Sequence, residues 1–207
     1  MYMEETLHRY LDDLASALPA PGGGSTAALS GAMGAALASM VCRITLGKDA
    51  YADVHQEIEE LLQKTESLRN RFQQLLQEDI EAYRHLATSY KLPRETSEER
   101  KYRTDMIQKQ LVKAALVPLE VVERAAKLMR SCERIAEIGN VTVLSDVTTG
   151  AILASCSGKS AASMVHINMR SMKDDTLVLE IENRLNSALG IIEVGVDQVI
   201  NVVGSRA

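Results

Sequence analysis

Asp79 is the charged residue whose sequence surroundings are best suited to chemistry. Leu75 lies four residues before it and Tyr83 four residues after it, so on a helix Asp79 falls on an apolar stripe. A carboxylate withdrawn from water on such a stripe has a raised pKa, which suits it to proton transfer. The alternative is a structural acid that accepts hydrogen bonds from a neighbouring helix end.

Three consecutive glycines, Gly22, Gly23 and Gly24, stand immediately before Ser25 and a long run of small residues. The stretch lacks the GK[ST] ending of a phosphate-binding P-loop and does not match GxGxxG, and no predicted strand precedes it. Consecutive glycines expose backbone N–H groups, and a helix N-terminus beside them favours anions. A tight turn that needs positive φ angles is the alternative interpretation.

Further polar candidates lie near the ends of a second run of small residues. Asp146 follows Ser145 at a predicted helix start, where an acidic residue also complements the helix dipole. Asn140 follows a glycine that stops the preceding helix. Asn168 lies late in a mainly apolar helix, so its amide needs a hydrogen-bond partner if it is buried.

Basic residues near the ends of both small-residue helices could hold an anionic ligand, although solvation at the surface is the default for each: Arg43, Lys48, Lys159, Arg170 and Lys173. The four histidines show no metal-ligand spacing, and no Cys/His cluster exists, so we expect no metal. Three widely spaced cysteines without a CxxC motif fit a reducing compartment.

The elements that must position these residues are helices, and the sequence predicts an all-α, single-domain bundle of long antiparallel helices over residues 1–207. The expected helices cover 4–18, a small-residue helix capped by Ser25 or Thr26 and ending near Leu46, 51–90, 96–138, 145–169 and a last helix after 175. Thr96 and Glu99 have capping-box spacing, and Pro118 should kink or divide its helix. Val141–Leu144 is the one strand candidate. The two small-residue helices could cross closely, because Gly and Ala let backbones approach.

Composition excludes several classes of protein. The net charge of −5, with no Trp and one Phe, argues against a nucleic-acid-binding surface. No charged residue occurs between Leu14 and Cys42, but prolines and glycines interrupt this run and Ala, Gly and Ser dominate it, which favours a buried helix over a membrane span. The charged N-terminus is unlike a secretory signal, so we expect a cytoplasmic protein.

Five segments together resemble the formiminotransferase-cyclodeaminase C-terminal family: PAPGGGSTAALSGAMGAALASMV, LGKDAY, LLQEDIEAY, LVPLEV and GNVTVLSDVTTGAILA. The similarity covers nearly the whole chain. The family includes folate cyclodeaminase domains and stand-alone methenyltetrahydrofolate cyclohydrolases. The resemblance implies an all-helical homodimer that acts on a tetrahydrofolate derivative without a further cofactor, at a site associated with the glycine-rich segment.

The resemblance implies that Asp79 and Asp146 are the catalytic candidates. The residues expected to bind the substrate are Gly22, Gly23, Gly24, Ser25, Lys48, Asn140, Ser145 and Asn168. Because 207 residues hold no counterpart of a formiminotransferase domain, we expect a 5,10-methenyltetrahydrofolate cyclohydrolase. A 5-formiminotetrahydrofolate cyclodeaminase is the alternative. A non-catalytic folate-binding or scaffolding dimer is the rival from another class.

Overall fold

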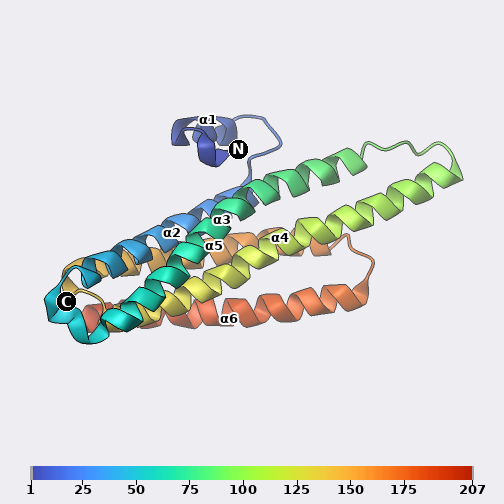
Figure 1. Ribbon diagram of the computed structural model, residues 1–207. Coiled ribbons are helices and arrows are strands. Elements are labelled where there is room, and N and C mark those ends of the chain that lie inside the picture. Colours follow the sequence, from blue (N-terminus) through green and yellow to red (C-terminus); the bar gives the residue numbers. More distant parts are fainter. Residues whose placement is uncertain (1, 207) are drawn as a thin grey trace.

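The computed structural model describes residues 2–206, and throughout this part of the chain the ordered elements are helices (Figure 1). The all-α expectation is therefore confirmed. The α-helices are α1 (Leu7–Ala15), α2 (Gly23–Leu46), α3 (His55–Ser89), α4 (Ser97–Ile138), α5 (Leu144–Met169) and α6 (Asp175–Arg206). Short 3-10 turns form η1 (Tyr2–Glu4), η2 (Asp49–Val54) and η3 (Val141–Val143).

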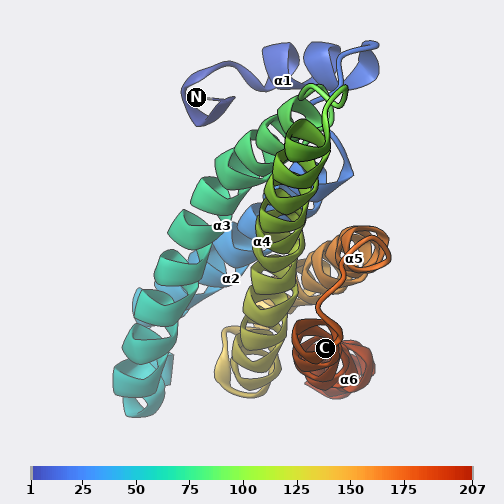
Figure 2. The same cartoon turned by 90° about the vertical axis from the view of Figure 1, so that its right-hand side faces the viewer.

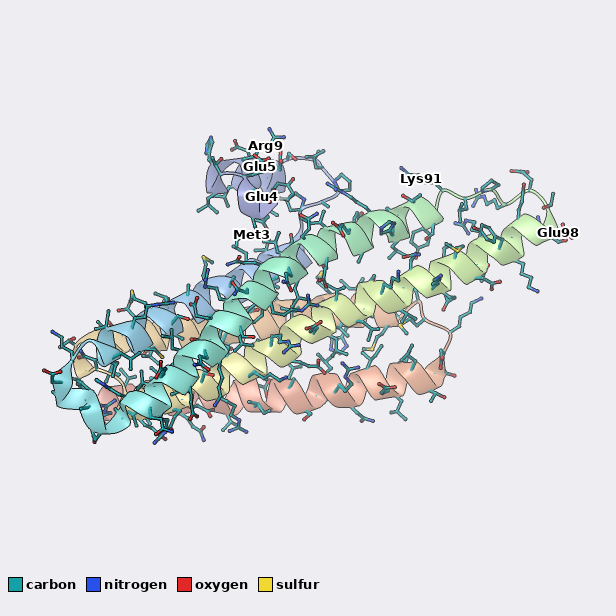
Figure 3. The ribbon with its side chains drawn as sticks, viewed as in Figure 1. Met3, Glu4, Glu5, Arg9, Lys91 and Glu98 are labelled. Carbon is teal, nitrogen blue, oxygen red and sulfur yellow. The ribbon has the colours of Figure 1, made fainter. Side chains whose placement is uncertain are left out.

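The long helices form one bundle around a continuous apolar core. Helix α2 packs against α3 and α5, α4 packs against α3 and α5, and α6 covers α4 and α5. Helix α1 lies outside this bundle, and the hairpin of α3 and α4 extends beyond the other helices (Figures 1 and 2). Lys91 and Glu98 lie at the free tip of that hairpin (Figure 3).

Several helix boundaries follow the local signals in the sequence. Thr96 and Glu99 form the predicted capping box, with the Glu99 N–H donating to Thr96 Oγ1 at 3.1 Å. Gly47 ends α2 and Gly139 ends α4, as expected. The strand candidate at Val141–Leu144 is wrong, since those residues form η3 and the first residue of α5.

Helix α2 begins earlier than its predicted cap. Gly22 is the N-cap and Ser25 lies within the first turn, so the expectation that Ser25 or Thr26 caps the helix is wrong. The Gly22 N–H donates to Ser25 Oγ at 3.1 Å, and Ser25 Oγ donates to the Gly22 carbonyl at 2.9 Å. Ser25 thus satisfies the backbone of the cap residue from inside the helix, and Gly22 needs no side chain to start it.

Pro118 lies within α4 without dividing it, which corrects one of the two outcomes expected for this proline. A proline has no N–H to donate to the carbonyl four residues earlier, here that of Ala114. Asn168 of α5 replaces the missing donor, because its Nδ2 lies 2.8 Å from the Ala114 carbonyl oxygen. A side chain from a neighbouring helix therefore satisfies the backbone that the proline leaves open.

Close contact between α2 and α5 confirms the expectation for the two small-residue helices. A Cβ added at Gly34 would lie 2.8 Å from the Gly150 carbonyl oxygen, and one at Gly150 would lie 3.2 Å from the Gly34 oxygen. By length and composition alone, three stretches of the described chain could cross a membrane: Gly23–Leu46, Val141–Met169 and Asp175–Arg206.

Candidate functional site

A cavity of about 380 Å³ lies where the N-terminus of α2 meets α3, α4 and α5. This volume is within the usual range for small-molecule sites. Its walls come from residues far apart in the sequence: Pro19, Ala20, Gly22, Gly23, Gly24, Asp79, Ala82, Tyr83, Leu86, Tyr90, Leu111, Ala114, Met164, Ile167, Asn168 and Ser171. The cavity therefore brings together the three glycines, Asp79 and Asn168, which are five of the residues that the sequence singled out.

The carboxylate of Asp79 lies directly against the backbone of Gly24. A Cβ built on Gly24 would stand 2.1 Å from Asp79 Oδ1 and 2.7 Å from Oδ2, closer than real Cβ atoms approach. The position therefore requires a glycine so that the acid can approach the start of the helix. This close approach is a more specific reason for Gly24 than a turn with positive φ, because no glycine of the described chain has a positive φ.

Burial raises the pKa of the Asp79 carboxyl to about 6, because water is excluded from the charged form. A hydrogen bond from the backbone N–H of Ser25 opposes this shift by stabilising the carboxylate. That N–H belongs to the first turn of α2, where backbone donors have no partner within the helix. Asp79 thus combines both sequence interpretations, since it contacts a neighbouring helix end and also titrates close to neutral pH.

Asn168 lies on the opposite wall with its amide held in one orientation. Its Nδ2 donates to the carbonyl oxygens of Ala114 at 2.8 Å and Met164 at 2.9 Å, so both amide hydrogens are used. Its Oδ1 accepts no hydrogen bond from the described part of the chain. The expectation that Asn168 needs a partner is confirmed, and its oxygen remains available as an acceptor on the cavity wall.

Tyr10 supports the glycine segment from α1, and the sequence analysis missed it. The buried Tyr10 hydroxyl lies 3.2 Å from both Ser25 Oγ and Thr26 Oγ1. Ser25 is itself buried and lies behind the cavity wall, so it acts on the cavity through the backbone of the first turn. No spacing rule links a tyrosine to a glycine run fifteen residues later, and only the aromatic residue in an otherwise polar helix hinted at a buried contact.

The other predicted site residues lie at the opposite end of α2. The Asn140 N–H donates to Thr45 Oγ1 at 3.0 Å, and Asn140 Oδ1 accepts from the Thr142 N–H at 3.0 Å. Asn140 therefore has a capping role at η3. Ser145 and Asp146 follow at the start of α5, with no hydrogen bond or ion pair to their side chains from any residue that the structure describes.

Lys48 belongs to this second group, because it comes directly after the end of α2. From Gly24 to Lys48 the chain follows α2 for nearly its whole length, about 36 Å at 1.5 Å per residue. A single chain therefore does not place Lys48, Asn140, Ser145 or Asp146 beside Asp79. The structure separates the predicted residues into two groups, and the cavity contains only one of them.

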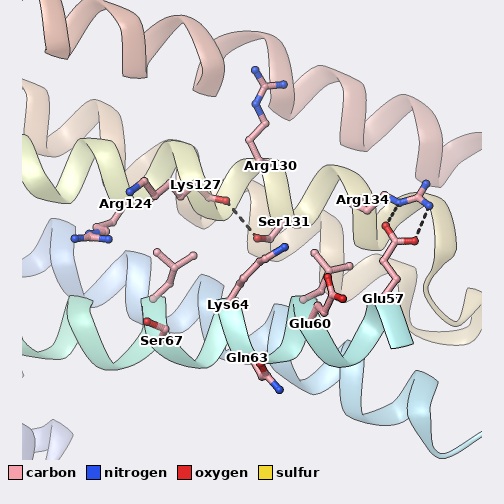
Figure 4. Close-up of a pocket in the computed structure, with 12 residues that line it drawn as sticks. Glu57, Glu60, Gln63, Lys64, Ser67, Arg124, Lys127, Arg130, Ser131 and Arg134 are labelled. Atoms are coloured by element: carbon pink, nitrogen blue, oxygen red, sulfur yellow. Dashed lines mark hydrogen bonds and ion pairs between the residues drawn. The ribbon is translucent and has the colours of Figure 1, made fainter. Parts of the chain in front are cut away.

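A wider groove of about 760 Å³ lies between α3 and α4 (Figure 4). It is lined by Lys64, Arg124, Lys127, Arg130 and Arg134 together with Glu57 and Glu60. Two of these cations are already neutralised: Arg134 Nε lies 2.6 Å from Glu57 Oε1, and Arg124 Nη2 lies 2.8 Å from Glu120 Oε1. None of the residues predicted from the sequence lines this groove, so we place the candidate site in the smaller cavity.

Other kinds of chemistry find little support in the described residues. Over residues 2–206 there is no group of three His, Cys, Asp or Glu side chains placed to hold a metal ion. Burial raises the pKa of the Cys42 and Cys132 thiols to about 12, so both are protonated at neutral pH. Asp79 is thus the titratable group of the cavity that is able to exchange a proton near pH 7.

Fold and site together define an all-helical protein with a partly buried carboxylate at the glycine-rich start of a helix. The chain belongs to the formiminotransferase-cyclodeaminase family, whose model matches residues 6–187.

A methenyltetrahydrofolate cyclohydrolase from Methylorubrum extorquens is 38% identical over 91% of this chain and 89% of its own length. The formimidoyltransferase-cyclodeaminase of Rattus norvegicus is 31% identical over 90% of this chain, which spans 35% of that relative. The crystal structure of formiminotetrahydrofolate cyclodeaminase from Thermotoga maritima superposes with a TM-score of 0.89 at 28% identity, covering 99% of this chain and 98% of that one.

Proposed function

We propose that the protein is a 5,10-methenyltetrahydrofolate cyclohydrolase, which interconverts the methenyl form with 10-formyltetrahydrofolate. The observation that carries this proposal is the contact between Asp79 and the start of α2, in a cavity where burial raises the pKa of Asp79 to about 6. The cyclohydrolase from Methylorubrum extorquens supports it, because similarity to that relative extends over nearly all of both chains.

Cyclohydrolysis begins when a water oxygen attacks the cationic methenyl carbon that bridges N5 and N10. The Asp79 carboxylate accepts a proton from this water as the C–O bond forms. The tetrahedral intermediate then loses its hydroxyl proton, the bond from carbon to N5 breaks, and N5 gains a proton. One proton is released overall, and the formyl group remains on N10. A positioned acid–base group of this kind contributes about 100-fold to 10,000-fold in rate.

A charged Asp79 also stabilises the cationic substrate before the attack. Its carboxylate is held by the Ser25 N–H in a partly buried site, where a charge interaction is stronger than in water. Asn168 Oδ1 accepts a hydrogen bond from an N–H of the pteridine ring, and the glycines allow the ligand to approach the backbone. No cofactor beyond the folate substrate enters this scheme.

The alternative activity is the cyclodeamination of 5-formiminotetrahydrofolate. In that reaction N10 attacks the formimino carbon and loses its proton, while the departing nitrogen gains one and leaves as ammonia. A single carboxyl with a pKa near neutrality serves both transfers, so Asp79 takes the same role. The Thermotoga maritima structure, named as a formiminotetrahydrofolate cyclodeaminase, is the observation that favours this alternative.

The setting of the proposed activity follows from the same expectations. We propose a cytoplasmic homodimer that takes folate substrates, including polyglutamylated ones, and that binds neither nucleic acid nor membrane. Asp146 remains the second catalytic candidate, although its position at the far end of α2 requires that it act outside the cavity of its own chain. A binding or scaffolding dimer without turnover is the rival reading.

The test follows the near-ultraviolet absorbance of the methenyl folate with purified protein. Loss of this absorbance from the methenyl form, faster than spontaneous hydrolysis, establishes the cyclohydrolase. Its appearance from the formimino form with release of ammonia establishes the cyclodeaminase instead. Binding of either folate without turnover would overturn both and support the rival reading.

A further inference from the structure

The candidate cavity contains no cation. Its lining includes no Lys, Arg or His, and Asp79 is its one carboxylate. A tetrahydrofolate ends in glutamate, whose carboxylates are ionised at neutral pH. If the proposed function is right, and this inference rests on it, the anionic end of the substrate needs a cation that the cavity of one chain does not supply.

The cavity opens toward an exposed apolar face formed by α2 and α5. Ile167 lines the cavity and is 57% exposed. From there the apolar face continues along α5 to Ile152, 49% exposed, and across to Met33 and Met40 of α2, 46% and 36% exposed. We call these exposed positions of α2 and α5 the α2–α5 face. The wall of the cavity is thus continuous with an apolar surface that has no partner in the single chain.

The α2–α5 face is nearly free of charge. Helix α2 has no charged residue from Gly23 to Cys42, and α5 has none between Asp146 and Lys159. Helix α6 also exposes apolar residues, including Val194 at 59%, but Glu193 lies beside it. An extended exposed surface without charges is typical of a protein interface, so the α2–α5 face is the better candidate.

A second copy of the chain fits the dimensions of this face. Helix α2 has 24 residues, which corresponds to about 36 Å of helix. Two helices side by side are about 20 Å wide, so the face covers about 700 Å². Stable interfaces bury about 800 Å² on each partner, and most symmetric pairs use the same surface on both subunits.

The antiparallel course of α2 and α5 determines what a second copy brings to the cavity. Gly23 lies beside Met164, and Gly34 lies beside Gly150, so the two helices run in opposite directions. A two-fold axis perpendicular to them, near their midpoints, places the C-terminal end of α2 from one copy over the glycine end of the other. The C-terminal end of α2 leads directly to Lys48.

We propose that two copies pack through the α2–α5 face in this antiparallel way, so that the partner subunit's Lys48 pairs with a carboxylate of the folate bound beside Asp79. The same arrangement brings the partner subunit's Ser145 and Asp146 toward the mouth of the cavity. Lys48 is exposed and forms no ion pair within the described residues, so its ammonium group is free to serve this role. The two groups of predicted site residues, separated in one chain, meet across the dimer.

Mixing two defective variants tests whether the site is shared. Asp79→Asn removes the acid, and Lys48→Glu places a charge that repels the substrate. In a mixed dimer one cavity combines the intact Asp79 of one chain with the intact Lys48 of the other. Refolding an equal mixture should recover about one quarter of wild-type kcat/KM, the statistical share of intact cavities in freely mixed two-fold dimers. Lys91→Glu, at the hairpin tip, is the matched control and should leave activity unchanged.

Disruption of the face tests the arrangement without using activity. Ile152→Asp should convert the dimer to a folded monomer, measured by light scattering after gel filtration and by circular dichroism. Val194→Asp, which places the same charge at an equally exposed position on α6, should leave the dimer intact. Cys156 lies at the middle of α5 and is the one exposed cysteine of the described residues. Mild oxidation should therefore link two copies through it.

The outcomes separate this inference from the proposed function. An active wild-type enzyme whose mixed variants recover nothing overturns the shared site and leaves the cyclohydrolase standing. Monomerisation by Val194→Asp but not by Ile152→Asp overturns the α2–α5 interface. A wild-type dimer that cross-links through Cys156 but turns over no folate contradicts the proposed function, and the Lys48 role falls with it.

Discussion

Gly24 and Asp79 are in direct contact across two helices, and a single added carbon on Gly24 would stand 2.1 Å from the carboxylate oxygen. Helix α2 supplies the backbone N–H groups, and α3 supplies the acid. The contact explains why a glycine precedes Ser25, and it makes the start of α2 and the ionisation of Asp79 parts of one arrangement.

Gly24→Ala is expected to displace Asp79 from the start of α2. The carboxylate must move away from the added methyl group, which breaks its hydrogen bond with the Ser25 N–H. We expect a loss of about 10-fold to 100-fold in kcat with a smaller change in KM, because a misplaced acid–base group loses most of its contribution. Gly190→Ala is the control, since a Cβ at that position meets nothing within 4 Å. Equal kinetics for both variants would contradict the contact.

Asp79→Asn should abolish most of the turnover and leave the fold intact. The amide has nearly the same shape and can still accept from the Ser25 N–H, but it exchanges no proton. The expected loss in kcat is about 100-fold to 10,000-fold. Steady-state kinetics and circular dichroism together check this, and near-wild-type kcat in a folded variant would show that Asp79 is not the acid–base group.

The pH dependence of stability should carry the signature of a carboxyl with a raised pKa. Burial raises the pKa of Asp79 to about 6, above the value of about 3.9 in an unfolded chain. Between those values the folded state binds this proton more tightly, so its contribution to the free energy of unfolding falls as the pH rises from about 4 to about 6.

Above about pH 6 the full cost of a partly buried carboxylate is present. Asp79→Asn removes it, and we expect the variant to be more stable than wild type at pH 7 by about 1–3 kcal/mol, with a smaller difference at pH 4. Urea unfolding at both pH values measures this. A stability difference that does not change with pH would mean that the pKa of Asp79 is ordinary.

Asn168→Ala should reveal the link between this amide and Pro118. Loss of the amide leaves the Ala114 carbonyl without a donor, which costs about 1–3 kcal/mol in the free energy of unfolding. Pro118→Ala restores the N–H that α4 lacks at this point. The double variant should therefore regain much of the stability that Asn168→Ala loses. Effects that simply add in urea unfolding would show that the two residues act independently.

Tyr10→Phe should weaken the support of the glycine segment by α1. The change removes a hydroxyl that lies 3.2 Å from Ser25 Oγ and from Thr26 Oγ1 but keeps the buried ring. We expect a loss of about 1 kcal/mol in stability and a modest decrease in kcat. Tyr102→Phe, at an exposed position of α4, is the control. Indistinguishable behaviour of the two variants would exclude a role for the Tyr10 hydroxyl.

Local rules predicted most of the fold. The capping box at Thr96 and Glu99 and the stops at Gly47 and Gly139 depend on residues close in sequence, and the structure contains all of them. The rules failed where another helix intervened. Nothing near Pro118 shows that Asn168 of α5 satisfies its helix, and so the sequence could not reveal that α4 continues without a division.

The candidate site was predictable in part for the same reason. The position of Asp79 on an apolar stripe indicated a buried acid, because that depends only on its own helix. Which residues share a cavity depends on how helices cross, and a pattern along the chain does not contain that information. Asp146 and Lys48 were therefore grouped with Asp79, although one chain places them at the other end of α2.

Asn168 has a consequence for how a ligand is read. Because the carbonyl oxygens of Ala114 and Met164 hold both hydrogens of the amide, the group cannot rotate to offer a donor to the cavity. A ring that presents an N–H to this wall is accepted, and a ring that presents a carbonyl there meets an oxygen. The proline in α4 thus determines, through one side chain, which edge of a flat heterocycle can face into the protein.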